Sequence, residues 1–213
     1  MKTATKYHSP LRASQAASTR TKILAACAAV METGADLTYS SVAQAADVQE
    51  RTVYRYFPSK ADLEAGLWGW ILDHLTHVDF TAGSEEELIA AMRNSFKGFD
   101  DGAPLIQAML HSRQGLEIRQ KQQPVRRAMF EACIEAAAPQ APPLIRTRAA
   151  AALQVLYSAT AWEMLRSFWG MDAVQAADTV ELAIRAMLAG LRLAAWQPDR
   201  LQEGNQDTLD RPI

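Results

Sequence analysis

Apolar residues recur at intervals of three and four along most of the chain, the spacing of helices that bury one face. The first stripe predicts a helix from Ser18 or Thr19 to about Glu32, and its members are Ile23, Leu24, Cys27, Val30 and Met31. Further helices are expected after Thr38, around 53–57, and at about 59–78, 84–101, 104–110, 124–138, 143–169 and 172–197. The polar segment 113–123 fits a short helix or irregular chain. Extended β-branched runs are missing and alanine is abundant, so we predict an all-α protein.

Short polar patterns mark where these helices begin. Three of them are capping boxes, in which the first side chain caps the helix and the fourth reaches back: Ser59-x-x-Asp62, Ser84-x-x-Glu87 and Asp172-x-x-Gln175. Prolines at 139, 142 and 143 form a firm boundary between two helices. We expect a flexible arm at 1–17, a small helical domain at 18–58, a helical body at 59–197 and a tail at 198–213.

Composition and charge narrow the class of protein. With 213 residues, 49% hydrophobic and 22% charged, the chain is neither disordered nor fibrous. It has no apolar run long enough for a membrane span and no apolar secretory segment at its start, and its two isolated cysteines suit a reducing compartment. We therefore expect a cytoplasmic protein without membrane association or cofactor. Residues 1–60 are net basic and the rest is net acidic, so we expect one end to meet a polyanion, with random scatter of surface charge as the alternative.

The segment 38–63, TYSSVAQAADVQERTVYRYFPSKADL, has the pattern of a helix-turn-helix. Small apolar residues would form its core, and the second helix would lie in the major groove of DNA. Its candidate DNA-binding residues are Thr38, Gln49, Glu50, Arg51, Thr52, Tyr54, Arg55, Tyr56 and Lys60. Arg51 is the best candidate for a guanine contact, with a phosphate contact or a solvated charge as the alternative. Glu50 could accept from cytosine or face solvent, and Lys60 is expected on a phosphate.

Two of these residues have a structural alternative. Tyr54 could contact phosphate or pack in the small core, and both roles could hold. Thr38 is expected to cap its helix and could also touch phosphate.

With RTKILAACAAVMETG before it and TVYRYFPSKADL at its end, residues 19–72 resemble the TetR family of transcriptional regulators. The resemblance implies an N-terminal helix-turn-helix followed by a helical domain that dimerises and binds a ligand. The family usually has glycine in the turn, where this chain has Asp47, which can also adopt a left-handed conformation. It often has serine at the cap of the recognition helix, where this chain has Gln49, a poor cap.

The apolar stripes of the last two predicted helices exceed what one helix pair can hide, which favours a homodimer. The expected dimer residues are Leu153, Met164, Ile184, Met187 and Leu191. A two-fold dimer would suit a palindromic operator in double-stranded DNA. The resemblance also implies a ligand cavity, for which the candidates are Phe96, Met109, His111, Arg113, Phe130, Tyr157, Trp162 and Glu163, with Gln154 as a further polar group. An apolar wall with few polar groups would suit a hydrophobic or aromatic effector, although an ordinary core role is favoured for most of the apolar side chains.

The leading interpretation is a repressor that a small molecule releases from its operator. One alternative is a constitutive or architectural DNA-binding protein without a ligand, and a less favoured one is an all-α enzyme, for which the sequence has no catalytic motif. Asp73, His74 and His77 could be metal ligands, but a solvated helix face is favoured and no metal site is predicted. Cys27 and Cys133 are expected in the core, with redox sensing by Cys133 as the alternative.

Overall fold

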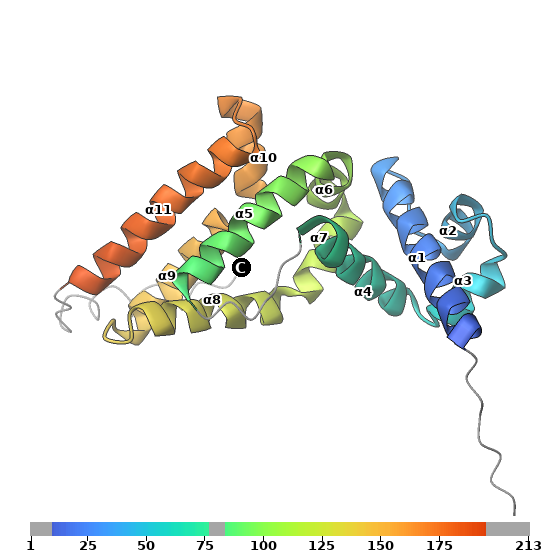
Figure 1. The fold of residues 1–213 in the computed structure, drawn as a ribbon, viewed down its shortest axis with the longest axis horizontal. Coiled ribbons are helices and arrows are strands. Elements are labelled where there is room, and N and C mark those ends of the chain that lie inside the picture. Colours follow the sequence, from blue (N-terminus) through green and yellow to red (C-terminus); the bar gives the residue numbers. More distant parts are fainter. Residues whose placement is uncertain (1–9, 77–83, 195–213) are drawn as a thin grey trace, which may run out of the picture. The chain divides into compact units, whose positions relative to one another are not determined.

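A computed structural model describes residues 10–76 and 84–194, and within them every regular element is a helix, as the sequence predicts. Eleven α-helices and one π-helical turn follow one another (Figure 1). Their bounds are α1 Pro10–Glu32, α2 Tyr39–Ala45, α3 Glu50–Tyr56, α4 Lys60–Ile71, η1 Leu72–Thr76, α5 Glu85–Asp101, α6 Ala103–His111, α7 Arg113–Lys121, α8 Gln123–Ala137, α9 Pro143–Leu156, α10 Ala159–Trp169 and α11 Ala173–Leu193.

The chain divides into two compact units. In the described residues, the first unit contains 10–76 and 94–123, and the second contains 84–93 and 124–194. Helix α5 therefore contributes its second half to the first unit and its first half to the second.

The first unit contains the helix-turn-helix with α4, α6 and α7 packed beside it. Its core consists of fully buried side chains from α1 to α4, namely Ile23, Cys27, Leu37, Val42, Val53, Phe57, Leu63 and Leu67. Helices α6 and α7 approach closely at Gly115, where an added Cβ would lie 2.6 Å from Met109 Cα. A side chain at residue 115 would therefore push the two helices apart.

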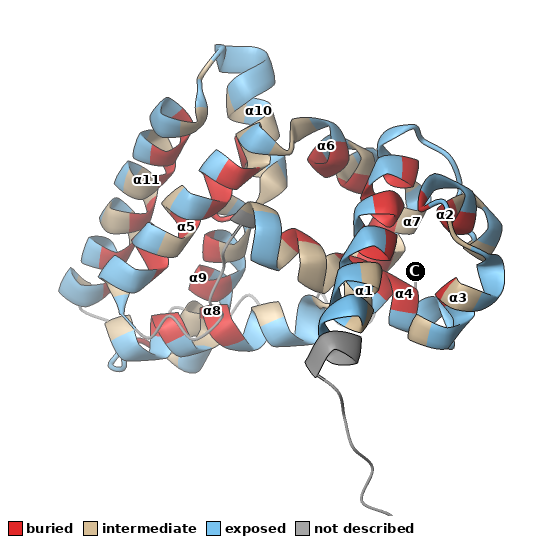
Figure 2. Ribbon diagram, turned by 45° about the vertical axis from the view of Figure 1, so that its right-hand side comes forward, coloured by how far each residue is buried: buried red, intermediate tan, exposed pale blue. Residues whose placement is uncertain are grey.

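In the second unit, α11 turns one apolar face inward (Figure 2). This buried face consists of Ala176, Ala177, Val180, Ile184, Leu188 and Leu191. Its partners in the core include Leu153 of α9 and Trp162 of α10, both with 0% exposure. Gly170, with φ 65°, ends α10 in the left-handed conformation and precedes the Asp172–Gln175 capping box of α11.

Most predicted helix boundaries are confirmed, including the capping boxes at Ser59, Ser84 and Asp172. The segment 113–123, left open by the sequence, is mostly the helix α7. The expectations for 1–9, 77–83 and 195–213, which include much of the arm and tail, lie outside the described residues.

The first helix begins at Pro10 and not near Ser18, so the expectation of an irregular arm is wrong for residues 10–17. Thr19 does not cap this helix, because its hydroxyl donates to the carbonyl oxygen of Gln15 at 2.9 Å, one turn earlier within the helix. Proline fits the first turn of a helix, and the residues after Pro10 tolerate helical geometry.

The single helix predicted at 143–169 is also wrong, because it is interrupted at Tyr157 and Ser158. The hydroxyl of Ser158 accepts from the backbone N–H of Ala161 at 3.1 Å and so caps α10. It also donates to the carbonyl oxygen of Val155 at 2.7 Å, which satisfies one free end group of α9. One serine therefore stabilises both sides of the interruption.

Candidate nucleic-acid interface

The turn between α2 and α3 has the conformation predicted for it. Asp47 is the one non-glycine residue of the described chain with positive φ, at 48°. Its N–H donates to Gln44 O at 3.1 Å, and the N–H of Val48 donates to Ala43 O at 3.0 Å. Asp47 therefore takes the place that glycine usually has in this turn, as the sequence suggests.

Helix α3 is fixed by one buried side chain and starts without a side-chain cap. Val53 has 0% exposure and fixes the helix to the core of the helix-turn-helix. Gln49 occupies the N-cap position, and its side chain makes no capping hydrogen bond, which confirms the expectation that it is a poor cap. In place of a side-chain cap, the N–H of Thr52 donates to the carbonyl oxygen of Gln49 at 2.7 Å.

The remaining side chains of α3 form a polar face that points away from the core. Gln49, Glu50, Arg51, Tyr54 and Arg55 are exposed. The two others proposed for this helix, Thr52 and Tyr56, are half-buried, and the guanidinium of Arg55 lies 5.1 Å from the ring centre of Tyr56. This is the distribution that a helix needs in order to contact base edges with one face.

Tyr54 stacks on Tyr39, a residue that the sequence analysis did not single out. The ring centroids are 3.8 Å apart and the planes differ by 8°. The hydroxyl of Tyr39 donates to Phe57 O at 2.8 Å, which ties this ring to the end of α3. Tyr54 is 47% exposed, so it packs against a neighbouring ring without entering the core. Burial, followed by the nearby Tyr54 and Asp62, raises the pKa of Tyr39, which favours the neutral hydroxyl.

One hollow of about 320 Å³ brings several candidate residues together. It is lined by Leu37, Thr38, Tyr39, Ser40, Glu50, Tyr54, Lys60 and Leu63. Thr38 caps α2 as predicted, because its side chain accepts from Ser41 N at 3.0 Å. Hydroxyl groups, an ammonium group and the start of α4 thus surround one space, which is the combination that binds phosphate.

The start of α4 is fixed by its capping box. Asp62 Oδ2 accepts from the N–H of Ser59 at 2.9 Å and from its hydroxyl at 2.7 Å, and the N–H of Asp62 donates to Ser59 Oγ at 3.1 Å. The side chain of Lys60, the first residue of the helix, is 60% exposed. The ammonium group therefore sits on a rigid base and remains accessible to solvent.

Residues 23–65 match the family described as "Bacterial regulatory proteins, tetR family". They form a TetR-family helix-turn-helix domain. The chain accordingly contains the DNA-binding domain of TetR-family transcriptional regulators, which are not enzymes. The curated proteins include no match to the chain. The matched segment runs from the middle of α1 into the first turns of α4, so it contains the whole turn, the recognition helix and Lys60.

The candidate effector residues fall into both units. Phe96 and Met109 are buried in the first unit, where His111 and Arg113 are exposed and Arg113 pairs with Glu117 at 3.0 Å. The candidates in the second unit are Phe130, Tyr157, Trp162 and Glu163, of which the first three are buried.

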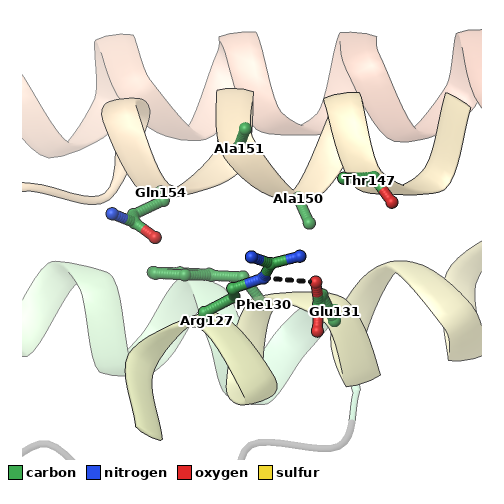
Figure 3. Close-up of a pocket in the computed structure, with 7 residues that line it drawn as sticks. All are labelled: Arg127, Phe130, Glu131, Thr147, Ala150, Ala151 and Gln154. Atoms are coloured by element: carbon green, nitrogen blue, oxygen red, sulfur yellow. Dashed lines mark hydrogen bonds and ion pairs between the residues drawn. The ribbon is translucent and has the colours of Figure 1, made fainter. Parts of the chain in front are cut away.

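Within the second unit, Phe130 and Tyr157 touch edge to face, with ring centroids 5.9 Å apart. A cavity of about 200 Å³ lies beside Phe130, between α8 and α9 (Figure 3). Its lining is Arg127, Phe130, Glu131, Thr147, Ala150, Ala151 and Gln154. Arg127 Nε donates to Glu131 Oε1 at 2.7 Å across one side of this space.

The five proposed dimer residues have different environments within one chain. Leu153 and Ile184 are fully buried and Leu191 is 7% exposed, so these three belong to the core of their own unit. Met187 is half-buried and Met164 is 55% exposed. The exposed large apolar side chains of α9 to α11 are Val155, Met164, Phe168, Trp169, Val174, Leu182 and Leu193. This set is called the outer apolar face below.

Both cysteines are buried, as predicted. Burial raises the pKa of Cys27 to about 12, and burial together with the charge of Glu87 raises the pKa of Cys133. High thiol pKa values disfavour the reactive thiolate, which argues against redox sensing by Cys133.

No group of three potential ligands that could hold a metal ion occurs among the described residues. His77 lies outside them, whereas His74 stacks on Trp70 at 4.7 Å. In the described part of the chain, no helix is both long and apolar enough to cross a membrane.

Sequence reasoning missed a buried carboxylate beside the interface. Glu64 is 3% exposed and pairs with Lys121 of α7. A second missed contact joins the same two regions, where Leu37 N donates to Gln114 Oε1 at 3.0 Å. Both contacts join residues more than 50 positions apart, so local patterns carried no signal for the pairing. Glu64 itself could have been flagged, because it follows Leu63 on the apolar side of α4.

Proposed function

We propose that the chain is a homodimeric repressor that binds a palindromic operator and leaves it when a small hydrophobic or aromatic effector binds. The polar face of α3, anchored by Val53, is the observation that carries this proposal. Arg51 is assigned to a base edge, and Thr38, Tyr54 and Lys60 are assigned to phosphates. We further propose that the protein acts in the cytoplasm, where buried, unpaired thiols such as Cys27 remain reduced.

Selection of bound DNA fragments from the source genome tests the operator claim. The enriched fragments should share a motif whose two halves are inverted copies, with centres about 34 Å apart or a multiple of that distance. Enrichment of fragments without any common motif would support the constitutive, architectural alternative. Repeating the selection with candidate metabolites then separates a ligand-released repressor from a protein that binds DNA constitutively.

The outer apolar face supports the proposed dimer. Met164 and Phe168 are one turn apart on α10, and Leu182 and Leu193 flank small exposed residues of α11, among them Ala186 and Gly190. Small residues allow two helices to approach closely, and a large apolar face without a partner is unusual for a monomer. We therefore assign the seam to this face in place of Leu153, Ile184 and Leu191.

The cavity between α8 and α9 is the space that best supports an effector site. The ring of Phe130 lies on the α8 side, and the methyl group of Ala150 points toward α8 from α9 (Figure 3). Arg127 and Gln154 provide polar groups at the sides. An apolar surface with few polar groups suits a small aromatic molecule that carries one or two hydrogen-bonding groups.

A pair of matched variants tests this site. Ala151→Leu places a larger side chain in the cavity, whereas Ala152→Leu adds the same side chain to an exposed position of the same helix that does not line it. A panel of single-ring aromatic compounds is screened for release of operator DNA. A compound that releases the native protein should fail on Ala151→Leu and succeed on Ala152→Leu, whereas equal release from both variants would place the effector elsewhere.

We propose that the effector acts by changing the separation of the two recognition helices. Two helices must match one period of DNA, so a shift of a few ångströms in each breaks the match. The coupling must be reciprocal, so operator DNA should weaken effector binding by the same factor that effector weakens DNA binding. Calorimetry on an identified effector with and without operator tests this point, and equal affinities would contradict the mechanism.

A further inference from the structure

Glu64 is a buried carboxylate placed between two lysines. Its side chain is 4% exposed and lies one turn after Lys60 on α4. One of its oxygens, Oε2, accepts a hydrogen bond from the ammonium group of Lys121, the last residue of α7. The other oxygen, Oε1, lies 3.9 Å from Lys60 Nζ, which is beyond hydrogen-bond distance.

The two lysines therefore share the carboxylate unequally. A buried carboxylate is strongly unfavourable without a cation, and in the structure Lys121 supplies the direct partner. The side chain of Lys60 is 60% exposed and keeps its ammonium group beside the hollow formed with Thr38 and Tyr54. No further Lys or Arg of the described residues forms an ion pair with Glu64.

We propose that Glu64 is a positioning residue for DNA binding and that Lys121 determines whether Lys60 is available to phosphate. With Lys121 in place, the charge of Glu64 is compensated and Lys60 can turn to DNA. Without Lys121, the carboxylate takes Lys60 as its partner, since residues four apart on a helix meet readily. A phosphate must then compete with a buried carboxylate for the same ammonium group.

This arrangement connects α7 to the DNA-contacting end of α4. Gln114, at the opposite end of α7, accepts from the N–H of Leu37, the residue before Thr38. Helix α7 thus holds the helix-turn-helix domain at two points, one beside the cap of α2 and one beside Lys60. Displacement of α7 would have the same effect as loss of Lys121. The inference rests on the proposed phosphate contact of Lys60 and adds to it the residues that control it.

The test measures affinity for a selected operator fragment, together with the slope of log affinity against log salt concentration, for a set of variants. Lys60→Met should weaken binding and reduce the slope by about 1, because one phosphate contact is lost. Lys121→Met should reproduce both effects, with an affinity loss of about three- to tenfold for a single ion contact. Lys121→Arg keeps the charge and should bind nearly as the native protein does.

The decisive variant is the double substitution Glu64→Gln with Lys121→Met. It removes the competing carboxylate, so affinity and slope should return to within about twofold of the native values. Glu117→Gln with Lys121→Met is the matched control, because it has the same net charge but removes an exposed carboxylate of α7. This control should not restore binding. Lys97→Met, at an exposed lysine of α5, controls for loss of one positive charge.

Several results would overturn the proposal. If Lys121→Met lost the same DNA affinity alone and in combination with Glu64→Gln, Lys121 would contact DNA itself. If Glu117→Gln restored the DNA affinity of the Lys121→Met variant, the loss of affinity would be explained by net charge alone. Unchanged binding by Lys60→Met would remove the phosphate contact and this inference with it, while the proposed DNA-binding function would survive if an α3 variant still lost specificity. Melting temperatures identify misfolded variants, and for these Lys121→Gln replaces Lys121→Met.

Discussion

At the residue scale, α3 separates anchoring from recognition within one turn. Val53 faces the core and fixes the helix, whereas Arg51 is exposed on the opposite side. Tyr54 combines the two roles. Its ring stacks on that of Tyr39, and almost half of Tyr54 stays exposed. Arg51 can therefore be replaced without disturbing the fold, which makes its proposed role in recognition testable by substitution.

Arg51→Ala should relax sequence preference. A bidentate contact to guanine contributes about 1–3 kcal/mol of discrimination, so binding to the operator should weaken by that amount while binding to random DNA changes little. Anisotropy titrations with both fragments measure the difference. Equal losses on the two fragments would assign Arg51 to the DNA backbone.

The two thiols should be unreactive in the folded protein. Burial raises the pKa of Cys27 to about 12 and also raises that of Cys133, so at pH 8 both thiols stay protonated. A thiol-specific chromophoric reagent should label neither residue in native protein and both in denaturant. Rapid labelling of Cys133 in native protein would restore the redox interpretation.

At the element scale, α11 is held to the first half of α5 by arginines. Arg185 donates to Glu86 at 2.9 Å and to Glu181 at 2.8 Å, and Arg93 donates to Glu181 at 2.7 Å. These hydrogen bonds lower the pKa of Glu86 and of Glu181 below the usual value of 4.5. Carboxylates with lowered pKa values stabilise the fold above the unfolded value and lose this effect as pH falls through the folded value.

Arg185→Met should therefore change how stability depends on acid. The variant should melt at a lower temperature than the native protein at pH 7, and the difference should shrink as pH falls below 4.5, where Glu86 and Glu181 become protonated. Thermal melts between pH 7 and pH 3 measure this convergence. Arg148→Met, at an exposed arginine, is the control. A difference that stays constant across this range would exclude these ion pairs as its cause.

Turns and helix ends could be predicted from the sequence where residues close together in the chain determine them. The left-handed turn at Asp47 and the capping boxes involve residues within five positions of each other, and short-range hydrogen bonds determine them. The interruption at Ser158 was missed because serine also occurs inside helices, and apolar spacing continues across it. The pairing of Glu64 with Lys121 depends on tertiary packing and has no local signal.

At the scale of the whole molecule, the residues of the proposed dimer seam also depend on tertiary packing, which local sequence patterns do not show. Helix α11 carries apolar residues on two faces, with Ile184 inside the unit and Leu182 outside it. The spacing of apolar residues revealed both faces of α11. It could not determine which of the two is buried within a single chain and which is left exposed. The fold class and the helix-turn-helix domain follow from sequence more readily, because this motif is continuous along the chain.

Substitutions on the exposed face and on the buried face of the second unit should affect different properties, namely the dimer and the stability of the fold. Leu182→Glu or Phe168→Glu should give monomers of 23.4 kDa that keep their helical content, since both side chains are exposed in one chain. Ile184→Ala should instead lower the free energy of unfolding by about 2–5 kcal/mol. Light scattering and denaturant melts measure these two effects.

Val125→Glu, at an exposed position of α8, is the control and should leave the mass at twice that of one chain. A native protein that scatters as a 23.4 kDa monomer at micromolar concentration would contradict the proposed dimer.

We propose that α3 determines the DNA sequence preference of this protein. The most direct measurement compares the affinity of the native protein for a selected operator fragment with its affinity for a scrambled fragment of equal length, at fixed salt. We expect a preference of at least about a thousandfold, most of which is lost when Gln49, Glu50, Arg51 and Thr52 are all replaced by alanine. Equal affinity of the native protein for both fragments, or an undiminished preference after the replacement, would contradict it.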